Sequence, residues 1–171
     1  GCRWFRSKAR VIKNIQIIEE MPIENALILF IQVNYQDDTI ETYLLPISFV
    51  SDDVSHSLLA HYPEAVIATV KLSRTSGHLI DSTYDPSFQG ALFTTLKEKR
   101  KPKGKSGKLQ ATISKHFKVN GVKADHKEAL QSRILGADQT NSSLSFADRY
   151  FLKIYRRIEE GTNPDVELQG H

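Results

Sequence analysis

The stretch from Gln139 to Lys153 reads QTNSSLSFADRYFLK and indicates a β-hairpin that carries a lysine on its returning strand. Its first five residues are small or polar, so their backbone amides can approach an anion closely and their hydroxyls can add hydrogen bonds. We predict strands over Ser143 to Ala147 and over Tyr150 to Arg156. A polar loop that leads into a hairpin with such a lysine is typical of the way kinases hold nucleotide phosphates.

The surroundings of Lys153 follow from strand alternation. It shares one face of its predicted strand with Phe151 and Tyr155, while Leu152 and Ile154 lie on the other face. Since both faces are apolar, we expect the strand to be buried on both sides. A buried lysine requires a nearby anion, because an unpaired buried charge is costly.

That anion is expected to be a nucleotide phosphate together with a Glu from the next helix, as in kinase-like folds. Asn163-Pro164 is a helix-start signal, since Asn can cap free amides and Pro is tolerated in the first turn. This helix supplies Glu167, with Glu159 and Glu160 before it as less favoured alternatives. The predicted nucleotide-binding residues are therefore Gln139, Thr140, Asn141, Ser142, Ser143, Lys153 and Glu167. By residue pattern alone, an ordinary turn and a surface lysine are the more frequent interpretation.

Upstream of this stretch, the first 83 residues predict mostly antiparallel β-structure, because runs rich in Ile, Leu and Val alternate with turn signals. Pro46 is expected to end its strand or to place it at a sheet edge. Ser51-Asp52-Asp53 can cap a short helix that runs to about Tyr62. The expected strands are Val11 to Glu20, Ala26 to Tyr35, Thr39 to Ile47, Ala65 to Leu72 and Gly77 to Thr83.

A helix is predicted from Asp85-Pro86 to about Lys99, with apolar side chains spaced to face a core. We place the boundary between two subdomains at this helix, where one β-rich unit passes into another. Further strands are expected over Leu109 to Phe117 and Ala129 to Leu135. The fold class is therefore α+β, with a β-rich first unit over residues 1–88 and a second unit over 89–171.

Composition excludes several classes of protein. With 40% hydrophobic and 25% charged residues the chain can build a core, and no apolar run is long enough to cross a bilayer. The single cysteine, Cys2, cannot form an internal disulfide, which favours a reducing cytoplasmic setting. The six histidines lack metal-site spacing, so no metal site is assigned. The basic segment from Lys97 to Lys108 is interpreted as a solvated loop and not as a nucleic-acid site, because it lacks interleaved aromatic residues.

Three pieces of the chain carry a family resemblance. They are Arg3-Trp4-Phe5 with Lys8 and Arg10, the QTNSS hairpin that ends in Leu152-Lys153, and the stretch from Arg156-Arg157 through Gly161-Thr162-Asn163-Pro164-Asp165-Val166-Glu167. Together they resemble the maltokinase family. In this family Gly often follows the opening Trp-Phe, where this chain has Arg6, and the loop more often reads QSNTS where this chain has QTNSS. Both exchanges keep the polarity of the motif.

The resemblance implies a maltokinase N-terminal cap over residues 1–88, followed by part of a protein-kinase-like (aminoglycoside-phosphotransferase-like) N-lobe over residues 89–171. It implies phosphate transfer from ATP, with Mg²⁺, to maltose to give maltose 1-phosphate in trehalose and α-glucan metabolism. The catalytic Asp and the Mg²⁺ ligands are expected on a C-terminal lobe beyond His171. We therefore expect this chain to be inactive alone, with no catalytic residue and no tightly bound cofactor.

The expected partners are that C-terminal lobe and a fused or associated trehalose synthase domain. The alternative function, from a different class, is a non-catalytic interaction or regulatory cap module attached to a trehalose synthase. The β-rich first 83 residues favour this alternative, because they carry no obvious catalytic group.

Overall fold

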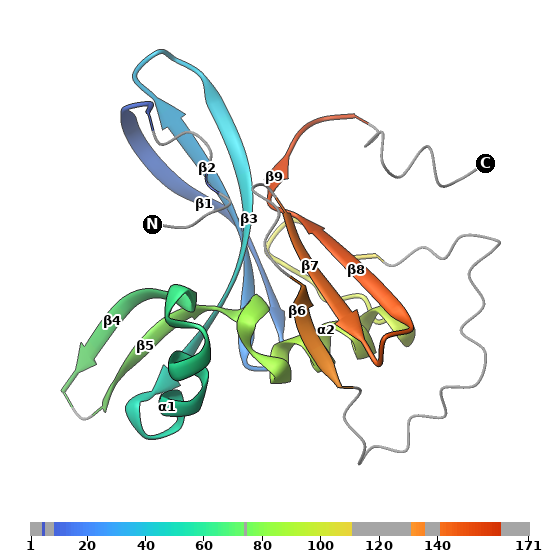
Figure 1. The fold of residues 1–171 in the computed structure, drawn as a ribbon. Helices are drawn as coiled ribbons and strands as arrows, with labels where there is room; N and C mark the ends of the chain where they lie inside the picture. The colour runs from blue at the N-terminus through green and yellow to red at the C-terminus, as the bar shows by residue number, and fades with distance from the viewer. Residues whose placement is uncertain (1–4, 6–8, 74, 111–130, 136–140, 162–171) are drawn as a thin grey trace.

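The computed structural model describes residues 5, 9–73, 75–110, 131–135 and 141–161, which form two antiparallel sheets with a helix packed between them (Figure 1). The first sheet is built mostly from residues 12–81 and the second from residues 132–155. The strand predicted over Leu109 to Phe117 and the helix predicted from Asn163 lie largely or wholly outside the described residues.

The first sheet has the strand order β1-β2-β3-β5-β4, and all its neighbours are antiparallel. The predicted strands are confirmed, although several boundaries move by a few residues. Glu24 has a positive φ of 49° in the tight turn between the first two strands. The five strands are β1 (Ile12–Ile23), β2 (Ala26–Tyr35), β3 (Ile40–Ser51), β4 (Val66–Leu72) and β5 (Thr75–Asp81).

The prediction for Pro46 was wrong, because β3 neither ends there nor lies at an edge. Pro46 is buried inside the strand and pairs in register with Ile28 of β2. On the other side, β3 changes partner here: Leu44 N donates to Arg156 O at 2.7 Å, and pairing with β5 starts at Ile47. N–H groups of alternate residues point to the same edge of a strand, so the N–H group that Pro46 lacks would point to the same edge as that of Leu44. At this edge Pro46 lies in the gap between the contact with Arg156 and the start of the pairing with β5.

Two helices flank the first sheet. The helix α1 (Asp52–His61) begins after Ser51, whose side chain makes no capping hydrogen bond, so the predicted serine cap is not formed. The helix α2 (Pro86–Lys97) follows a short 3₁₀ turn, η2 (Ser82–Tyr84). Asp85 caps α2, because its carboxylate accepts a hydrogen bond from Ser87 N at 2.9 Å.

The second sheet has the order β6-β7-β8, with β6 (Ser132–Leu135), β7 (Asn141–Phe146) and β8 (Tyr150–Tyr155). The predicted hairpin is therefore confirmed, with its first strand starting two residues earlier. Beyond β8 the chain crosses to the first sheet, where β9 (Arg157–Ile158) pairs with Thr42 and Tyr43 of β3. The chain that leaves the second sheet is thus part of the first (Figure 1).

One core joins the two sheets through α2. Phe88 and Leu92 of the helix are buried, and Phe93 stacks on Phe146 with ring centroids 4.7 Å apart. Both sheets contribute buried side chains to this core: Met21, Ile23, Ala26 and Ile28 from the first, and Leu144, Phe146 and Ile154 from the second. The helix that the sequence marks as a boundary is therefore shared by both units.

The outer part of β1 behaves differently from this core. Its apolar side chains Ile15 and Ile17 are 60% and 54% exposed, although they pair with Val33 and Ile31 of β2. They lie at the open edge of the sheet. Of the helices that the structure describes, none is both long and apolar enough to cross a membrane.

Candidate functional site

The candidate site is the face of the second sheet that carries Lys153. We call it the open face, because Lys153 and Phe151 on it are exposed. Leu135, Ser143 and Lys153 are register partners and form one row across β6, β7 and β8. Residues 136–140 connect the end of β6 to the start of β7, so this connection begins directly after Leu135 of the lysine's row and is followed by two residues before Ser143 reaches that row. Paired residues point to the same side of a sheet, which puts Ser143 and Lys153 on one face.

The expected burial of Lys153 was wrong, because the side chain is exposed. Phe151, its neighbour on the same face, is 71% exposed, whereas Leu152 and Ile154 on the opposite face pack against the core. Among the described residues, Leu152 and Ile154 of β8 pack in the core that contains α2, whereas Phe151 and Lys153 on the other face of the strand are exposed. The ammonium of Lys153 lies 5.1 Å from the centroid of the Tyr155 ring, a cation–π contact.

The predicted loop residues divide between the two faces of β7. Asn141 and Ser143 lie on the face of Lys153, and Asn141 is the register partner of Tyr155. Ser142 lies on the other face and is buried, with its hydroxyl accepting hydrogen bonds from Arg156. The side chain of Ser142 therefore faces the interior and not the open face. The remaining predicted site residues, Gln139, Thr140 and Glu167, lie outside the described residues.

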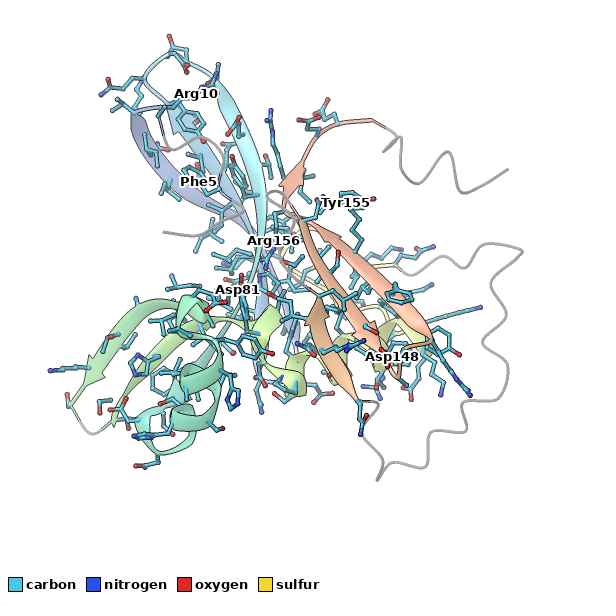
Figure 2. The ribbon with its side chains drawn as sticks, in the orientation of Figure 1. Phe5, Arg10, Asp81, Asp148, Tyr155 and Arg156 are labelled. Carbon is cyan, nitrogen blue, oxygen red and sulfur yellow. The ribbon has the colours of Figure 1, made fainter. Side chains whose placement is uncertain are left out.

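Sequence reasoning missed the role of Arg156, which is fully buried where the two sheets meet (Figure 2). Its Nη2 lies 2.7 Å from Asp81 Oδ2 and 2.8 Å from Thr83 Oγ1, and its Nε lies 3.0 Å from Ser142 Oγ. One guanidinium thus joins the end of β5, the turn η2 and the start of β7. Arg156 belongs to one of the stretches that resemble the maltokinase family, but nothing in the sequence indicated this contact, because its partner Asp81 is 75 positions away.

The next residue, Arg157, makes a second ionic contact with the first sheet. Its guanidinium lies 3.4 Å from Glu41 Oε1, and Glu41 is 7% exposed. The carboxylate also accepts hydrogen bonds from the hydroxyls of Tyr35 and Tyr43, at 2.7 and 2.6 Å. Two consecutive arginines after β8 therefore bind acidic residues of the first sheet.

A third contact joins the basic segment to β1. Glu19 accepts hydrogen bonds from the backbone amides of Lys105, Ser106 and Gly107 at 2.7 to 2.8 Å, and from the Ser106 hydroxyl at 2.6 Å. The Ser106 hydroxyl and amide hydrogen bonds lower the pKa of Glu19 to about 2, since they favour its charged form. The segment is an exposed loop, as predicted, but its second half is attached to β1 through Glu19.

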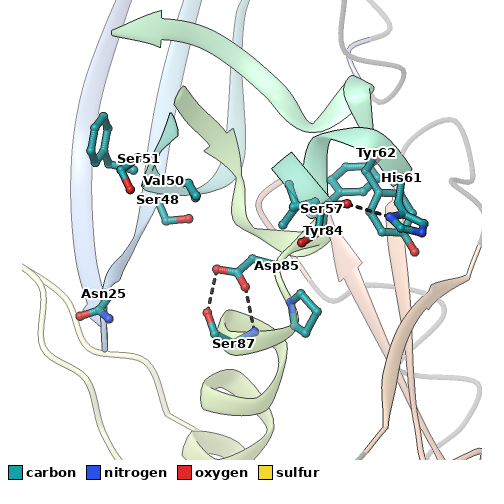
Figure 3. Close-up of a pocket in the computed structure, with 13 residues that line it drawn as sticks. Asn25, Ser48, Val50, Ser51, Ser57, His61, Tyr62, Tyr84, Asp85 and Ser87 are labelled. Atoms are coloured by element: carbon teal, nitrogen blue, oxygen red, sulfur yellow. Dashed lines mark hydrogen bonds between the residues drawn. The ribbon is translucent and has the colours of Figure 1, made fainter. Parts of the chain in front are cut away.

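The described residues also enclose a groove of about 790 Å³ between α1, β3 and the start of α2 (Figure 3). Tyr62 and Tyr84 line it, with ring centroids 5.4 Å apart. Its carboxylate, Asp85, accepts hydrogen bonds from the backbone and hydroxyl of Ser87, so it serves the N-terminus of α2. None of the residues that line the groove belongs to the second sheet, so it is separate from the Lys153 face.

Comparison with known families identifies the region that contains strands β1 to β5 of the first sheet. Residues 1–85 match the family model described as the maltokinase N-terminal cap domain. This part of the chain is a maltokinase cap region. The matched region holds all of β1 to β5 and ends at Asp85, the residue that caps α2. The recognition made from the sequence motifs is therefore confirmed for the first half of the chain.

The three contacts described above, two ion pairs and one set of hydrogen bonds to a carboxylate, all run between the cap and later residues. Asp81, Glu41 and Glu19 lie inside the matched region, whereas Arg156, Arg157 and the segment around Ser106 follow it. In each contact the cap supplies the carboxylate. Among the described residues, no group of three or more His, Cys, Asp or Glu side chains could hold a metal ion.

Proposed function

We propose that the cap and the second sheet belong to a maltokinase that transfers the γ-phosphoryl group of ATP to maltose, giving maltose 1-phosphate. In this proposal the second sheet is the nucleotide-binding part of a kinase-like N-lobe. The observation that carries it is the row Leu135, Ser143 and Lys153, which puts a lysine of the third strand beside the connection between the first two. Protein kinases cover the phosphates with such a connection and place their lysine on the third strand.

The exposure of Lys153 supports this role. A lysine on an open face can bring its ammonium to a bound phosphate without a prior desolvation cost, and Ser143 beside it can add a hydroxyl. We assign Lys153 to the α- and β-phosphates, residues 139–143 to the loop around the phosphates, and Glu167 to the orientation of Lys153. Mg²⁺, when bound, neutralises charge that develops on the phosphates. The proposal places its ligands and the catalytic Asp on a C-terminal lobe.

The experiment uses the full-length gene product and follows maltose-dependent consumption of ATP. Lys153→Ala should lower kcat/KM by about 100-fold or more, because the lost charge acts on the transferring phosphoryl group. Lys71→Ala is the matched control, since Lys71 is an exposed strand lysine in the cap, and it should leave the rate unchanged. An unchanged rate in Lys153→Ala contradicts the assignment and favours the alternative, a non-catalytic cap module attached to a trehalose synthase.

A further inference from the structure

The groove between α1, β3 and the start of α2 takes no part in the proposed phosphoryl transfer, yet it has the size of a ligand site. Its volume of about 790 Å³ lies within the range of about 300–1,000 Å³ that is usual for small-molecule sites. Of the described residues that line it, all except Pro86 and Ser87 belong to the cap. The side chains of this lining indicate which class of ligand fits.

Aromatic rings form much of the groove wall. Tyr62 follows α1 and Tyr84 belongs to η2, and their rings lie 5.4 Å apart at an angle of 49°. Phe49 of β3 also lines the groove and is 43% exposed. Its ring lies over Gly77, where a Cβ would come 2.6 Å from Phe49 Cζ. The π face of an aromatic ring carries partial negative charge, so a ligand with weakly positive C–H groups on a flat face stacks on it.

Polar groups lie between these aromatic side chains. In Figure 3 Asp85 has the two tyrosines on one side and Ser48 and Ser51 on the other. Each oxygen of the Asp85 carboxylate accepts one hydrogen bond from Ser87 and keeps a lone pair for a second donor. The carboxylate can therefore accept from hydroxyl groups of a ligand while it caps α2.

The charges of the lining argue against an anionic ligand. Among the described residues that line the groove there is no Lys or Arg, and Asp85 repels a phosphate or a carboxylate. His61 Nδ1 donates to Ser57 O at 2.7 Å, which leaves Nε2 of the neutral ring as an acceptor. The ligand that fits is neutral, donates hydroxyl groups and has flat C–H faces, and these are the properties of a sugar.

We propose that this groove is a carbohydrate site in the cap, separate from the site of phosphoryl transfer, and that it binds glucosyl units. The identity of the sugar rests on the proposed function, because maltose is a pair of α-1,4-linked glucosyl units and a longer α-1,4-glucan offers the same units. The cap thereby attaches the kinase to its substrate or to a chain of the same sugar.

The test is electrophoresis of the full-length gene product in native gels that contain soluble amylose, a linear α-1,4-glucan. Binding retards the protein relative to a gel without amylose, and the dependence on amylose concentration gives an apparent Kd. The wild type should be retarded. Tyr62→Ala and Phe49→Ala each remove an aromatic ring from the groove and should raise the apparent Kd by about 10-fold or more. Tyr62→Phe keeps the ring and should stay close to the wild type.

Phe151→Ala is the matched control, because Phe151 is 71% exposed on the second sheet and is not part of the groove lining. It should leave the retardation unchanged, as should Lys153→Ala. Thermal unfolding of each variant is measured alongside. If Tyr62→Ala does not fold, Phe49→Ala decides the matter, since loss of an exposed ring leaves the fold intact.

Excess maltose in the gel distinguishes the two sources of glucosyl units. Loss of retardation identifies a site that the free disaccharide fills, and retardation that persists identifies a site for the longer chain. Both results uphold a carbohydrate site in the groove, provided that the retardation depends on Tyr62 and Phe49.

A wild type that is not retarded, or aromatic variants that are retarded as strongly as the wild type, would overturn the inference. Either result in an enzyme that still phosphorylates maltose leaves the proposed function intact. Retardation that depends on Tyr62 and Phe49 in a full-length protein without maltokinase activity contradicts the proposed function and upholds the carbohydrate site.

Discussion

The cap sheet and the second sheet differ in how their strands use their two faces. In the cap, β1 and β2 are 12 and 10 residues long, and the outer part of β1 leaves Ile15 and Ile17 exposed. In the second sheet the strands have four to six residues; one face packs in the core with α2, while Phe151 and Lys153 on the other face are exposed. The smaller sheet therefore depends on the helix and the cap for its stability, and the proposed function uses the face that carries Lys153.

The difference between the two faces of the second sheet gives the largest expected effect. Phe146 is fully buried against Phe93, whereas Phe151 on the same hairpin is 71% exposed. Phe146→Ala should lower the free energy of unfolding by about 4 kcal/mol, because it leaves a cavity in the shared core. Phe151→Ala should change it by less than about 0.5 kcal/mol.

Denaturant unfolding followed by circular dichroism measures both values. A single transition that shifts as a whole in Phe146→Ala means that the cap and the second sheet unfold together, as their common core requires. Two separate transitions, with only one of them shifted, would contradict the view that the second sheet depends on the cap. Equal losses in the two phenylalanine variants would contradict the assignment of buried and open faces.

The fold could be predicted from the sequence where local signals determine it. Alternation and turn residues predicted the strands of the cap and the hairpin around Lys153, and Asp85-Pro86 predicted the start of α2. Pro46 was misjudged, because whether a proline ends a strand depends on where the neighbouring strands lie. In β3 the partner changes from β9 to β5 at that residue, and a change of partner has no local signature.

Only part of the candidate site could be predicted from the sequence. The row through Ser143 and Lys153 follows from the predicted hairpin, but the one-sided burial of β8 does not, since both faces of that strand are apolar in sequence. Arg156 is a residue type that is usually exposed, and its acidic partner is 75 positions away. Contacts of this kind depend on tertiary structure, so pattern and spacing cannot reveal them.

A smaller effect is expected at the element that the two regions share. Asp85 caps α2 by accepting from the backbone and hydroxyl of Ser87, and α2 packs against both sheets. Asp85→Ala should lower the free energy of unfolding by about 1 kcal/mol, the usual cost of a lost N-cap. Asp85→Asn retains a capping oxygen and should stay within a few tenths of a kcal/mol of the wild type. A full loss in the Asn variant would mean that the charge and not the cap matters.

The smallest effect is expected at the outer contact between the cap and the basic segment. The pKa of Glu19 is lowered from 4.5 to about 2, mainly by the Ser106 hydroxyl. A carboxyl group with a depressed pKa stabilises the folded state above its unfolded pKa, and this stabilisation is lost as the pH falls through the folded value. The attachment of Lys105, Ser106 and Gly107 should therefore be complete above about pH 4.5 and should weaken between there and about pH 2.

Amide chemical shifts of these three residues, followed by NMR during an acid titration, report this contact directly, because each backbone amide donates to Glu19. In Glu19→Gln the transition should disappear, since the amide side chain does not titrate. The amide of Leu44 serves as an internal control, because it donates to the backbone oxygen of Arg156 and neither residue has a carboxyl side chain. A transition near pH 4.5 in place of one near pH 2 would mean that the segment is not held by Glu19, and the basic loop would then behave as solvated chain.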